Sequence, residues 1–230
     1  MLILGMDTAS KTASTAVMDT GSQKILAEMR SEGRLSHSEN LMPMIDAALK
    51  CAGVKLGEID LFAAAVGPGS FTGIRIAVST VKGLAFGSAG ENCVGVSSLC
   101  SLAYNFYGYG GDILVLPAID ARRKQVYSAV FENLEYIKGD RVITVSELEA
   151  ELNAEFLGRR VAFVGDGARM CREEIDFAGI VQIPHILELP SAASLCRAAC
   201  EQYKKGGAVH ARSLSPAYLI KTQAEREYGK

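Results

Sequence analysis

The sequence feature that most constrains the fold is the run Gly67-Pro-Gly-Ser-Phe-Thr-Gly-Ile-Arg75, which joins an apolar segment to an amphipathic one. Glycines permit backbone conformations and close approaches that other residues exclude, and a proline stiffens the turn. A helix that begins directly after such a turn directs free N–H groups outward, which suits an anion. The run therefore predicts a strand, a phosphate-binding loop and a helix, although the same glycines would also serve a turn that is only tightly packed.

Composition indicates a folded protein with no general affinity for nucleic acid. The chain has 230 residues, 49% of them hydrophobic, and a net charge of −2, so it can bury one large core or two modest ones. Basic residues form only short clusters, at 122–124, 159–160 and 204–205. The apolar N-terminal segment is too short for a signal peptide, and no stretch of about 18 apolar residues suggests a membrane span. We therefore expect a cytoplasmic protein.

The cysteines and histidines do not form a metal-binding pattern. Six cysteines fall in expected helices and strands without a Cys-x-x-Cys pair, which is typical of reduced, buried thiols. The three histidines, His37, His185 and His210, are scattered along the chain. His37 stands just before a long expected helix, and we interpret it as a residue of the helix N-terminus or of an interface.

The apolar patterning predicts strands and helices along the whole chain. Alternating or continuous apolar runs indicate strands, and apolar spacings of three and four residues indicate helices, one of which begins with a capping box from Ser146 to Glu149. The expected strands are 2–7, 13–19, 24–30, 61–66, 93–96, 113–119, 134–138 and 161–164, and the expected helices are 38–52, 72–87, 98–106, 146–153 and 191–205.

The two halves of the chain follow the same plan, which indicates a duplication. When the first half is shifted by 113 residues, Asp7 coincides with Asp120, and both aspartates lie between a strand and a polar turn. A second glycine loop, Gly165-Asp-Gly167, follows a strand as the first loop does. We expect an N-terminal lobe at 1–107, a smaller C-terminal lobe at 108–204, and a tail at 205–230 that docks on the N-terminal lobe with Tyr218 and Leu219.

Two lobes with an aspartate hairpin and a glycine loop each resemble the actin, sugar-kinase and Hsp70 ATPase superfamily, a duplicated ribonuclease H-like α/β fold. In that architecture the aspartates face a cleft that holds nucleotide phosphates and Mg²⁺. No cofactor is firmly predicted, and ATP or ADP with Mg²⁺ is the one that the resemblance implies. The cleft residues would be Asp7, Gly67, Gly69, Ser70, Gly73, Asp120, Gly165, Asp166 and Gly167.

Two features of the hairpins weaken the case for a nucleotide. The sequence Asp7-Thr-Ala-Ser10 lacks the glycine that sugar kinases and Hsp70 proteins usually place two residues after the aspartate. Asp120 would alternatively hold the basic turn Arg122-Arg-Lys124 in place, which is a structural role. The sequence leaves both interpretations of the cleft open.

Four short sequences provide a more specific resemblance. They are Asp7-Thr-Ala-Ser10, His37-Ser-Glu-Asn-Leu-Met-Pro43, the glycine run 67–75 and Asp120-Ala-Arg122. Together they resemble the TsaB branch of the TsaD/TsaB family, which takes part in forming threonylcarbamoyladenosine (t6A) in tRNA and was formerly grouped with M22 glycoproteases. The resemblance extends from Met1 to about Tyr218, and it is most specific over the first 125 residues.

The resemblance implies a subunit without catalytic activity of its own. Catalytic TsaD members carry two metal-binding histidines one helical turn apart, where this chain has Ser98 and Leu102. The chain would bind and activate TsaD, together with the TsaE ATPase, for t6A formation at the adenosine 3′ of the anticodon in tRNAs reading ANN codons. Contact with tRNA would be indirect, through the complex. An ATP-binding phosphotransferase or ATPase of the same fold remains the alternative, whereas a peptidase has no support from the residues.

The helices expected at 38–52 and 72–87 carry apolar residues over a wider arc than one sheet contact needs. The wide arc favours a partner interface in which each subunit contributes two helices, and methionines suit such an adaptable surface. The alternative for any single residue is a broad core stripe. Without its partner the chain would form a homodimer through this face. The predicted interface residues are His37, Leu41, Met42, Met44, Ile45, Ile74, Arg75, Val78 and Val81.

Overall fold

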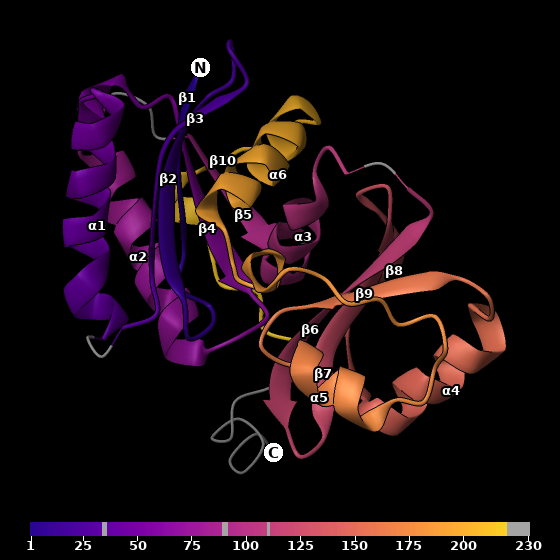
Figure 1. The fold of residues 1–230 in the computed structure, drawn as a ribbon. Coiled ribbons are helices and arrows are strands. Elements are labelled where there is room, and N and C mark those ends of the chain that lie inside the picture. Colours follow the sequence, from indigo (N-terminus) through magenta and orange to yellow (C-terminus); the bar gives the residue numbers. More distant parts are fainter. Residues whose placement is uncertain (34–35, 89–91, 110, 220–230) are drawn as a thin grey trace.

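Two β-sheets form the framework of the computed structural model, which describes residues 1–33, 36–88, 92–109 and 111–219 (Figure 1). The larger sheet has the strand order β10-β5-β4-β1-β2-β3, and the smaller sheet has the order β8-β7-β6-β9. The strands are β1 (Leu2–Asp7), β2 (Ala13–Asp19), β3 (Lys24–Ser31), β4 (Leu61–Gly67), β5 (Asn92–Ser97), β6 (Ile113–Arg122), β7 (Gln125–Glu132), β8 (Glu135–Thr144), β9 (Arg160–Val164) and β10 (Val209–His210).

The two sheets repeat one topology. In the larger sheet, β1 pairs antiparallel with β2 and parallel with β4, and β2 continues antiparallel to β3. In the smaller sheet, β6 pairs antiparallel with β7 and parallel with β9, and β7 continues antiparallel to β8. The expected duplicated, two-lobed α/β fold is therefore confirmed.

Helices cover both faces of the larger sheet and the far face of the smaller one (Figure 1). In the larger sheet, α1 and α2 lie on one face, and α3 and α6 lie on the other, between the two sheets. On the smaller sheet, α4 and α5 pack on the face turned away from the larger sheet. The helices are α1 (His37–Ala52), α2 (Phe71–Phe86), α3 (Ser98–Ala103), α4 (Val145–Glu155), α5 (Ala168–Glu174) and α6 (Ala192–Lys204), with short 3₁₀ turns at Leu56–Glu58, Tyr104–Phe106, His185–Leu187 and Ala211–Ser213.

The packing of α6 corrects the expected assignment of residues 191–205 to the C-terminal lobe. The Cys196 thiol lies against β2, with its Sγ 3.7 Å from the Ala16 carbonyl oxygen. A Cβ atom on Gly5 of β1 would lie only 2.6 Å from that sulfur, so glycine is needed for this approach. The chain returns to the first sheet before its tail, and position along the sequence does not reveal such a return.

The start of α4 also differs from the sequence expectation. The capping box is formed by Thr144 and Glu147 and not by Ser146 and Glu149: the Thr144 N–H donates to Glu147 Oε2 over 3.0 Å, and the Glu147 N–H donates to Thr144 Oγ1 over 3.2 Å. Both pairs have the required spacing. Thr144 ends β8 opposite Gln125, and its extended backbone makes it the N-cap residue.

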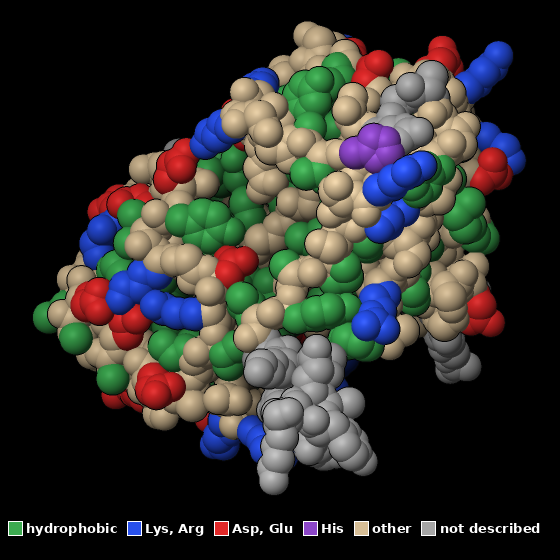
Figure 2. Space-filling view, turned by 180° about the vertical axis from the view of Figure 1, so that it is seen from behind, with side chains coloured by type: hydrophobic (Ala, Val, Ile, Leu, Met, Phe, Trp, Pro, Cys, Tyr) green, Lys and Arg blue, Asp and Glu red, His purple; other side chains and the backbone are tan. Residues whose placement is uncertain are grey.

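The face of the molecule in Figure 2 carries both signs of charge without a large patch of either. Figure 2 shows acidic and basic side chains interspersed over one face, as expected for a net charge of −2. The six cysteines are free thiols, and five of them are buried, whereas Cys51 is exposed, contrary to expectation. None of the helices in the described part of the chain is long and apolar enough to span a membrane.

The end of the chain returns along the larger sheet. Strand β10 pairs with β5, and further on the Ala217 N–H donates to the Val66 carbonyl over 2.7 Å. We call residues 211–219 the C-terminal strap. The last part of the expected tail, 220–230, lies outside the described residues.

Candidate functional site

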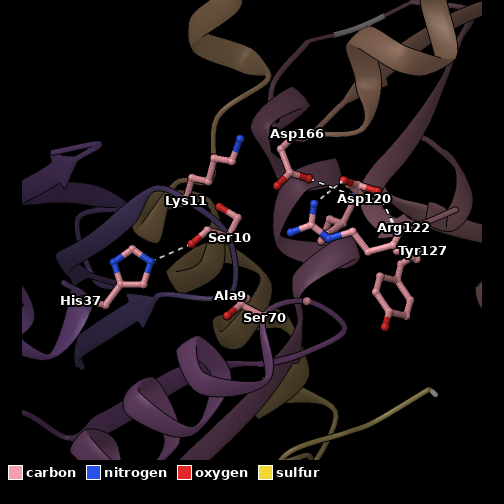
Figure 3. Close-up of a pocket in the computed structure, with 12 residues that line it drawn as sticks. Ala9, Ser10, Lys11, His37, Ser70, Asp120, Arg122, Tyr127 and Asp166 are labelled. Atoms are coloured by element: carbon pink, nitrogen blue, oxygen red, sulfur yellow. Dashed lines mark hydrogen bonds and ion pairs between the residues drawn. The ribbon is translucent and has the colours of Figure 1, made fainter. Parts of the chain in front are cut away.

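A cavity of about 510 Å³ lies where the β1–β2 turn of the first lobe faces the β6–β7 turn of the second. Figure 3 shows Lys11 and Ser10 on one side and Asp120, Arg122 and Asp166 on the other. Cavities of this size hold small ligands in many proteins. The cavity is lined by Ala9, Ser10, Lys11, His37, Gly69, Ser70, Ile119, Asp120, Ala121, Arg122, Tyr127 and Asp166.

Asp7 does not face this cleft, contrary to the sequence expectation. Its side chain is buried, and its Oδ1 accepts a hydrogen bond of 2.8 Å from the Ala9 N–H. Burial raises the pKa of Asp7 to about 6, although the Ala9 N–H and nearby His37 lower it. His37 Nε2 lies 2.7 Å from the Ser10 carbonyl oxygen, so this nitrogen carries the proton and donates it. Asp7 and His37 thus fix the two ends of the hairpin turn.

Asp120 and Asp166 do line the cleft, but both are engaged by their own lobe. Asp120 Oδ1 accepts from the Arg122 N–H over 2.7 Å, and its Oδ2 lies 3.6 Å from Arg122 Nη1. Asp166 Oδ1 accepts from the Asp120 N–H over 3.1 Å. Partial desolvation is the main cause that raises the pKa of Asp166. The structural interpretation of Asp120, that it holds the basic turn, is therefore supported, since Arg122 has a left-handed φ of 70°.

The first glycine loop packs against its own hairpin. Cβ atoms on Gly69 and Gly73 would collide with the carbonyl oxygens of Ala9 and Thr8. The Ser70 N–H donates to the Ala9 carbonyl over 2.7 Å, and Ser70 Oγ caps α2 by accepting from the Gly73 N–H over 3.2 Å. The glycines thus allow a close approach between two protein segments, and a serine side chain takes the place at the helix N-terminus that a phosphate would need.

Gly67 and Gly165, which were also predicted to bind phosphate, likewise pack closely against backbone carbonyl oxygens. A Cβ on Gly165 would lie 2.5 Å from the Ala118 carbonyl oxygen, which also accepts from the Gly167 N–H over 2.9 Å. A Cβ on Gly67 would lie 2.5 Å from the Ala217 carbonyl of the C-terminal strap. In both loops the glycines therefore allow close packing between segments of the chain, whereas Gly69 and Ser70 also line the open cleft.

The side chains of the cleft do not suggest a metal site either. Across residues 1–33, 36–88, 92–109 and 111–219, no group of three or more His, Cys, Asp or Glu side chains is arranged to hold a metal ion. Ser10, Lys11 and Tyr127 are among the lining residues that were not predicted from the sequence. Ser10 and Lys11 could have been predicted from the duplication. They follow Asp7 in the first hairpin turn, and in a duplicated fold this turn faces the equivalent turn that follows Asp120.

A second candidate site lies on the outer face of α1 and α2. A groove of about 480 Å³ runs between the two helices, and an adjacent hollow of about 390 Å³ continues past Met42. Met42 is 49% exposed, and Phe71, at the start of α2, is 39% exposed. We call this surface the α1–α2 groove; it is lined by Ser38, Leu41, Met42, Phe71, Thr72, Arg75, Ile76, Ser79 and Thr80.

Burial corrects part of the predicted interface. The structure places the predicted residues Leu41, Ile45, Ile74, Val78 and Val81 in the core. They belong to the stripes that pack on the sheet of their own lobe, although Leu41 also lines the α1–α2 groove and Ile45 lines the adjacent hollow. Met42 and Arg75 are exposed, and His37 and Met44 are partly exposed. Phe71 was not predicted as an interface residue. It is the first residue of α2, directly after the glycine loop, and it lines one end of the α1–α2 groove.

Comparison with known proteins places the chain in a family. The family model for TsaD, tRNA N6-adenosine threonylcarbamoyltransferase, matches residues 25–228. The tRNA threonylcarbamoyladenosine biosynthesis protein TsaB of Escherichia coli K12 is 31% identical over 95% of this chain and 94% of its own length. The TsaB protein of Bacillus subtilis 168 is 30% identical over 76% of each chain.

Solved structures agree with these sequence relatives. YeaZ from Pseudomonas aeruginosa has 28% identity and a TM-score of 0.77, over 95% of this chain and 99% of that one. Component A of the (R)-2-hydroxyglutaryl-CoA dehydratase of Acidaminococcus fermentans shares the fold alone, with 13% identity and a TM-score of 0.51 over 89% of this chain and 98% of that one. The chain therefore belongs to the TsaB branch of the TsaD family and takes part in the biosynthesis of threonylcarbamoyladenosine in tRNA.

Proposed function

We propose that this chain is a non-catalytic, cytoplasmic subunit that binds and activates a TsaD-type threonylcarbamoyltransferase through the α1–α2 groove. The observation that carries the proposal is the apolar groove itself, with Met42 and Phe71 exposed along it. Exposed apolar grooves of this kind serve as protein interfaces. A TsaE-type ATPase is the further member of the complex, and tRNA is contacted through the enzyme.

Family membership supports the choice of partner. The family model that matches this chain describes the enzyme, so enzyme and chain share one fold. A fold of this kind presents two helices equivalent to α1 and α2 on its outer face. Two such faces pack on each other around an approximate twofold axis and bury both grooves in a four-helix contact. In the absence of the enzyme, a second copy of this chain occupies the same face.

The residues of the two lobes support a role without chemistry of its own. Ser98 and Leu102 stand where the family resemblance places metal-binding histidines in the enzyme, and both are buried. The glycines of both loops pack against backbone carbonyls of the chain, which gives them a structural role. The chain would act by holding the enzyme in its active arrangement, a role that requires a surface and no reacting group.

The test is a binding and activity measurement with Met42→Glu. Purified chain is titrated into the threonylcarbamoyltransferase of the same genome by calorimetry, and t6A formation on unmodified tRNA is assayed with the complete set of components. A buried charge without a partner weakens interfaces strongly, so we expect a loss of affinity of roughly 10-fold to 100-fold, with t6A formation restored at high subunit concentration. The homodimer of the free chain should dissociate in parallel, as measured by sedimentation.

Leu157→Glu is the matched control. Leu157 is 77% exposed and lies between α4 and β9, on the second lobe. The control should bind and activate like the unmodified chain. If Met42→Glu binds the enzyme as tightly as the control does, the groove is not the interface and the proposal is wrong.

A further inference from the structure

The C-terminal strap is fastened to the first lobe before it reaches its exposed end. Lys82 Nζ of α2 donates to the carbonyl oxygens of Arg212 and Leu214, over 3.1 and 3.2 Å. The Leu214 side chain is buried, and the Ala217 N–H is bonded to the end of β4. These contacts hold the strap in place without help from the residues that follow.

Tyr218 nevertheless stacks on a side chain at the start of α2. Its ring lies on the Phe71 ring with a centroid distance of 5.1 Å and an interplanar angle of 28°. The Tyr218 hydroxyl accepts a hydrogen bond of 2.9 Å from Arg75 Nε. The Arg75 guanidinium lies 3.8 Å from the centroid of the Phe71 ring. We call these three side chains the strap stack.

The strap stack is exposed although its three side chains contact one another. Phe71 is 39% exposed and Tyr218 is 41% exposed, and Leu219 next to it is also exposed. Tyrosine, arginine and other large side chains held rigidly at a surface are the typical anchors of protein interfaces, because little rotamer freedom is lost on binding. Phe71 and Arg75 also line the α1–α2 groove, so the stack and the groove form one continuous surface.

The charge of Arg75 adds a requirement on the partner. Within the described residues, Arg75 makes no salt bridge, and its hydrogen bond to Tyr218 uses only Nε. Its two terminal NH₂ groups are the ones that bind a carboxylate side by side. The surface therefore matches a partner that presents an apolar side chain to the Tyr218 and Phe71 rings and a carboxylate to Arg75.

We propose that the C-terminal strap is part of the partner-binding face, and that Tyr218, held by Phe71 and Arg75, is an anchor residue for the threonylcarbamoyltransferase subunit. The inference rests on the proposed function, since the occupant is the same enzyme that fills the α1–α2 groove. The enzyme contributes a carboxylate opposite Arg75. If the strap had a purely structural role, its contacts at Leu214 and Ala217 would be sufficient, and Tyr218 would contribute nothing to the affinity for the enzyme.

The test compares Tyr218→Ala, Tyr218→Phe and the control Tyr109→Ala in the full chain. Tyr109 is 61% exposed and lies in the segment between the 3₁₀ turn Tyr104–Phe106 and β6, away from the groove. Calorimetric titration into the enzyme should show a loss of affinity of about 10-fold or more for Tyr218→Ala and of a few-fold for Tyr218→Phe, which keeps the ring but not the hydroxyl. Tyr109→Ala should bind like the unmodified chain.

The outcomes separate this proposal from the proposed function. If the unmodified chain binds and Tyr218→Ala binds equally well, the strap proposal is overturned and the groove remains the interface. If the unmodified chain does not bind at all, the proposed function itself fails. The melting temperature of each free variant is measured as well. If the melting temperature of Tyr218→Ala is more than about 5 °C lower, the test relies on Tyr218→Phe and Leu219→Ser, which keep an aromatic ring stacked on Phe71. Weaker binding of these two variants supports the proposal, and unchanged binding overturns it.

Discussion

The two hairpin turns that meet at the cleft are equivalent positions of a duplicated fold, yet their aspartates have different surroundings. Asp7 is 1% exposed, whereas Asp120 is exposed. Each carboxylate accepts the backbone N–H two residues ahead, Ala9 at 2.8 Å and Arg122 at 2.7 Å. The shared feature is an Asx turn, which closes a tight loop without any ligand. The feature that both halves of the duplicated fold retain is therefore the Asx turn.

The two glycine loops extend this comparison. In each lobe the loop lies against a backbone carbonyl of the neighbouring strand or turn: Ala9 for Gly69, and Ala118 for Gly165. In the first lobe the contact is tighter, because Gly73 of α2 also meets Thr8, whose hydroxyl donates to the Gly73 carbonyl over 2.6 Å. We conclude that the first loop holds its hairpin more firmly than the second loop does.

The largest expected effect is that of Gly73→Ala. The new methyl group would collide with the Thr8 carbonyl oxygen, and separating the two segments would disturb the Thr8 hydroxyl bond to the Gly73 carbonyl or the Ser70 cap of α2. We expect a loss of about 4 kcal/mol in the free energy of unfolding, measured by urea denaturation. Gly167→Ala, where the nearest atom is the Ala118 oxygen at 3.0 Å, should cost only about 1 kcal/mol.

Gly83→Ala controls for the general effect of replacing glycine in a helix. Gly83 lies in the same helix as Gly73, and among the described residues no atom beyond its chain neighbours and its own helix backbone lies within 4 Å of its added Cβ. Alanine is the better helix former, so this variant should be more stable by about 0.5 to 1 kcal/mol. Equal losses in Gly73→Ala and Gly167→Ala would contradict the difference between the two loops.

The next effect concerns the pH dependence of the two aspartates. Burial raises the pKa of Asp7 from 3.8 to about 6, so the folded chain binds this proton more tightly than the unfolded chain does. The stability that the protonated carboxyl provides is present below pH 3.8 and is lost as the pH rises to about 6. A shift of this size corresponds to about 3 kcal/mol.

Asp7→Asn removes this dependence and keeps the oxygen that accepts the Ala9 N–H. Between pH 4 and pH 7, the unmodified chain should therefore lose about 2 kcal/mol of stability relative to Asp7→Asn, as measured by urea denaturation at each pH. Asp120→Asn is the matched control, since it replaces an exposed carboxylate in the equivalent turn and keeps Asp7, so the loss of stability that Asp7 causes should persist in it. Parallel profiles for all three proteins would contradict a difference in burial between the two turns.

Sequence patterns predicted the framework well because hydrophobic periodicity is a local property. The strands from Leu2 to Gly67 and the helix that starts at Phe71 follow from runs that each bury one face or stripe. Long-range packing was harder to predict. The helix Ala192–Lys204 lies on the first sheet, and nothing in its own apolar stripe distinguishes one sheet from the other.

The candidate sites could be predicted only in part, for the same reason. Val78 has the apolar character of an interface residue, but only the fold reveals that the sheet of its own lobe already covers it. Asp7 matches an aspartate that would face a nucleotide, and only coordinates show that it bonds to Ala9. Tyr218 was expected to dock on the first lobe, but its pairing with Arg75 joins residues 143 positions apart, which no local pattern encodes.

The smallest expected effect is that of ATP with Mg²⁺ on the free chain. A ligand that binds the folded state raises the melting temperature according to its concentration and affinity. Because the glycines of both loops pack against backbone carbonyls and Asp7 is bonded within its own turn, we expect a shift of less than about 1 °C at millimolar ATP and Mg²⁺, measured by differential scanning fluorimetry. A larger shift that disappears in Asp120→Asn, but not in Asp7→Asn, would instead mean that the duplication kept a nucleotide site on one side only. The exposed aspartate would then be its functional residue, and the difference between the two hairpins would be one of function as well as burial.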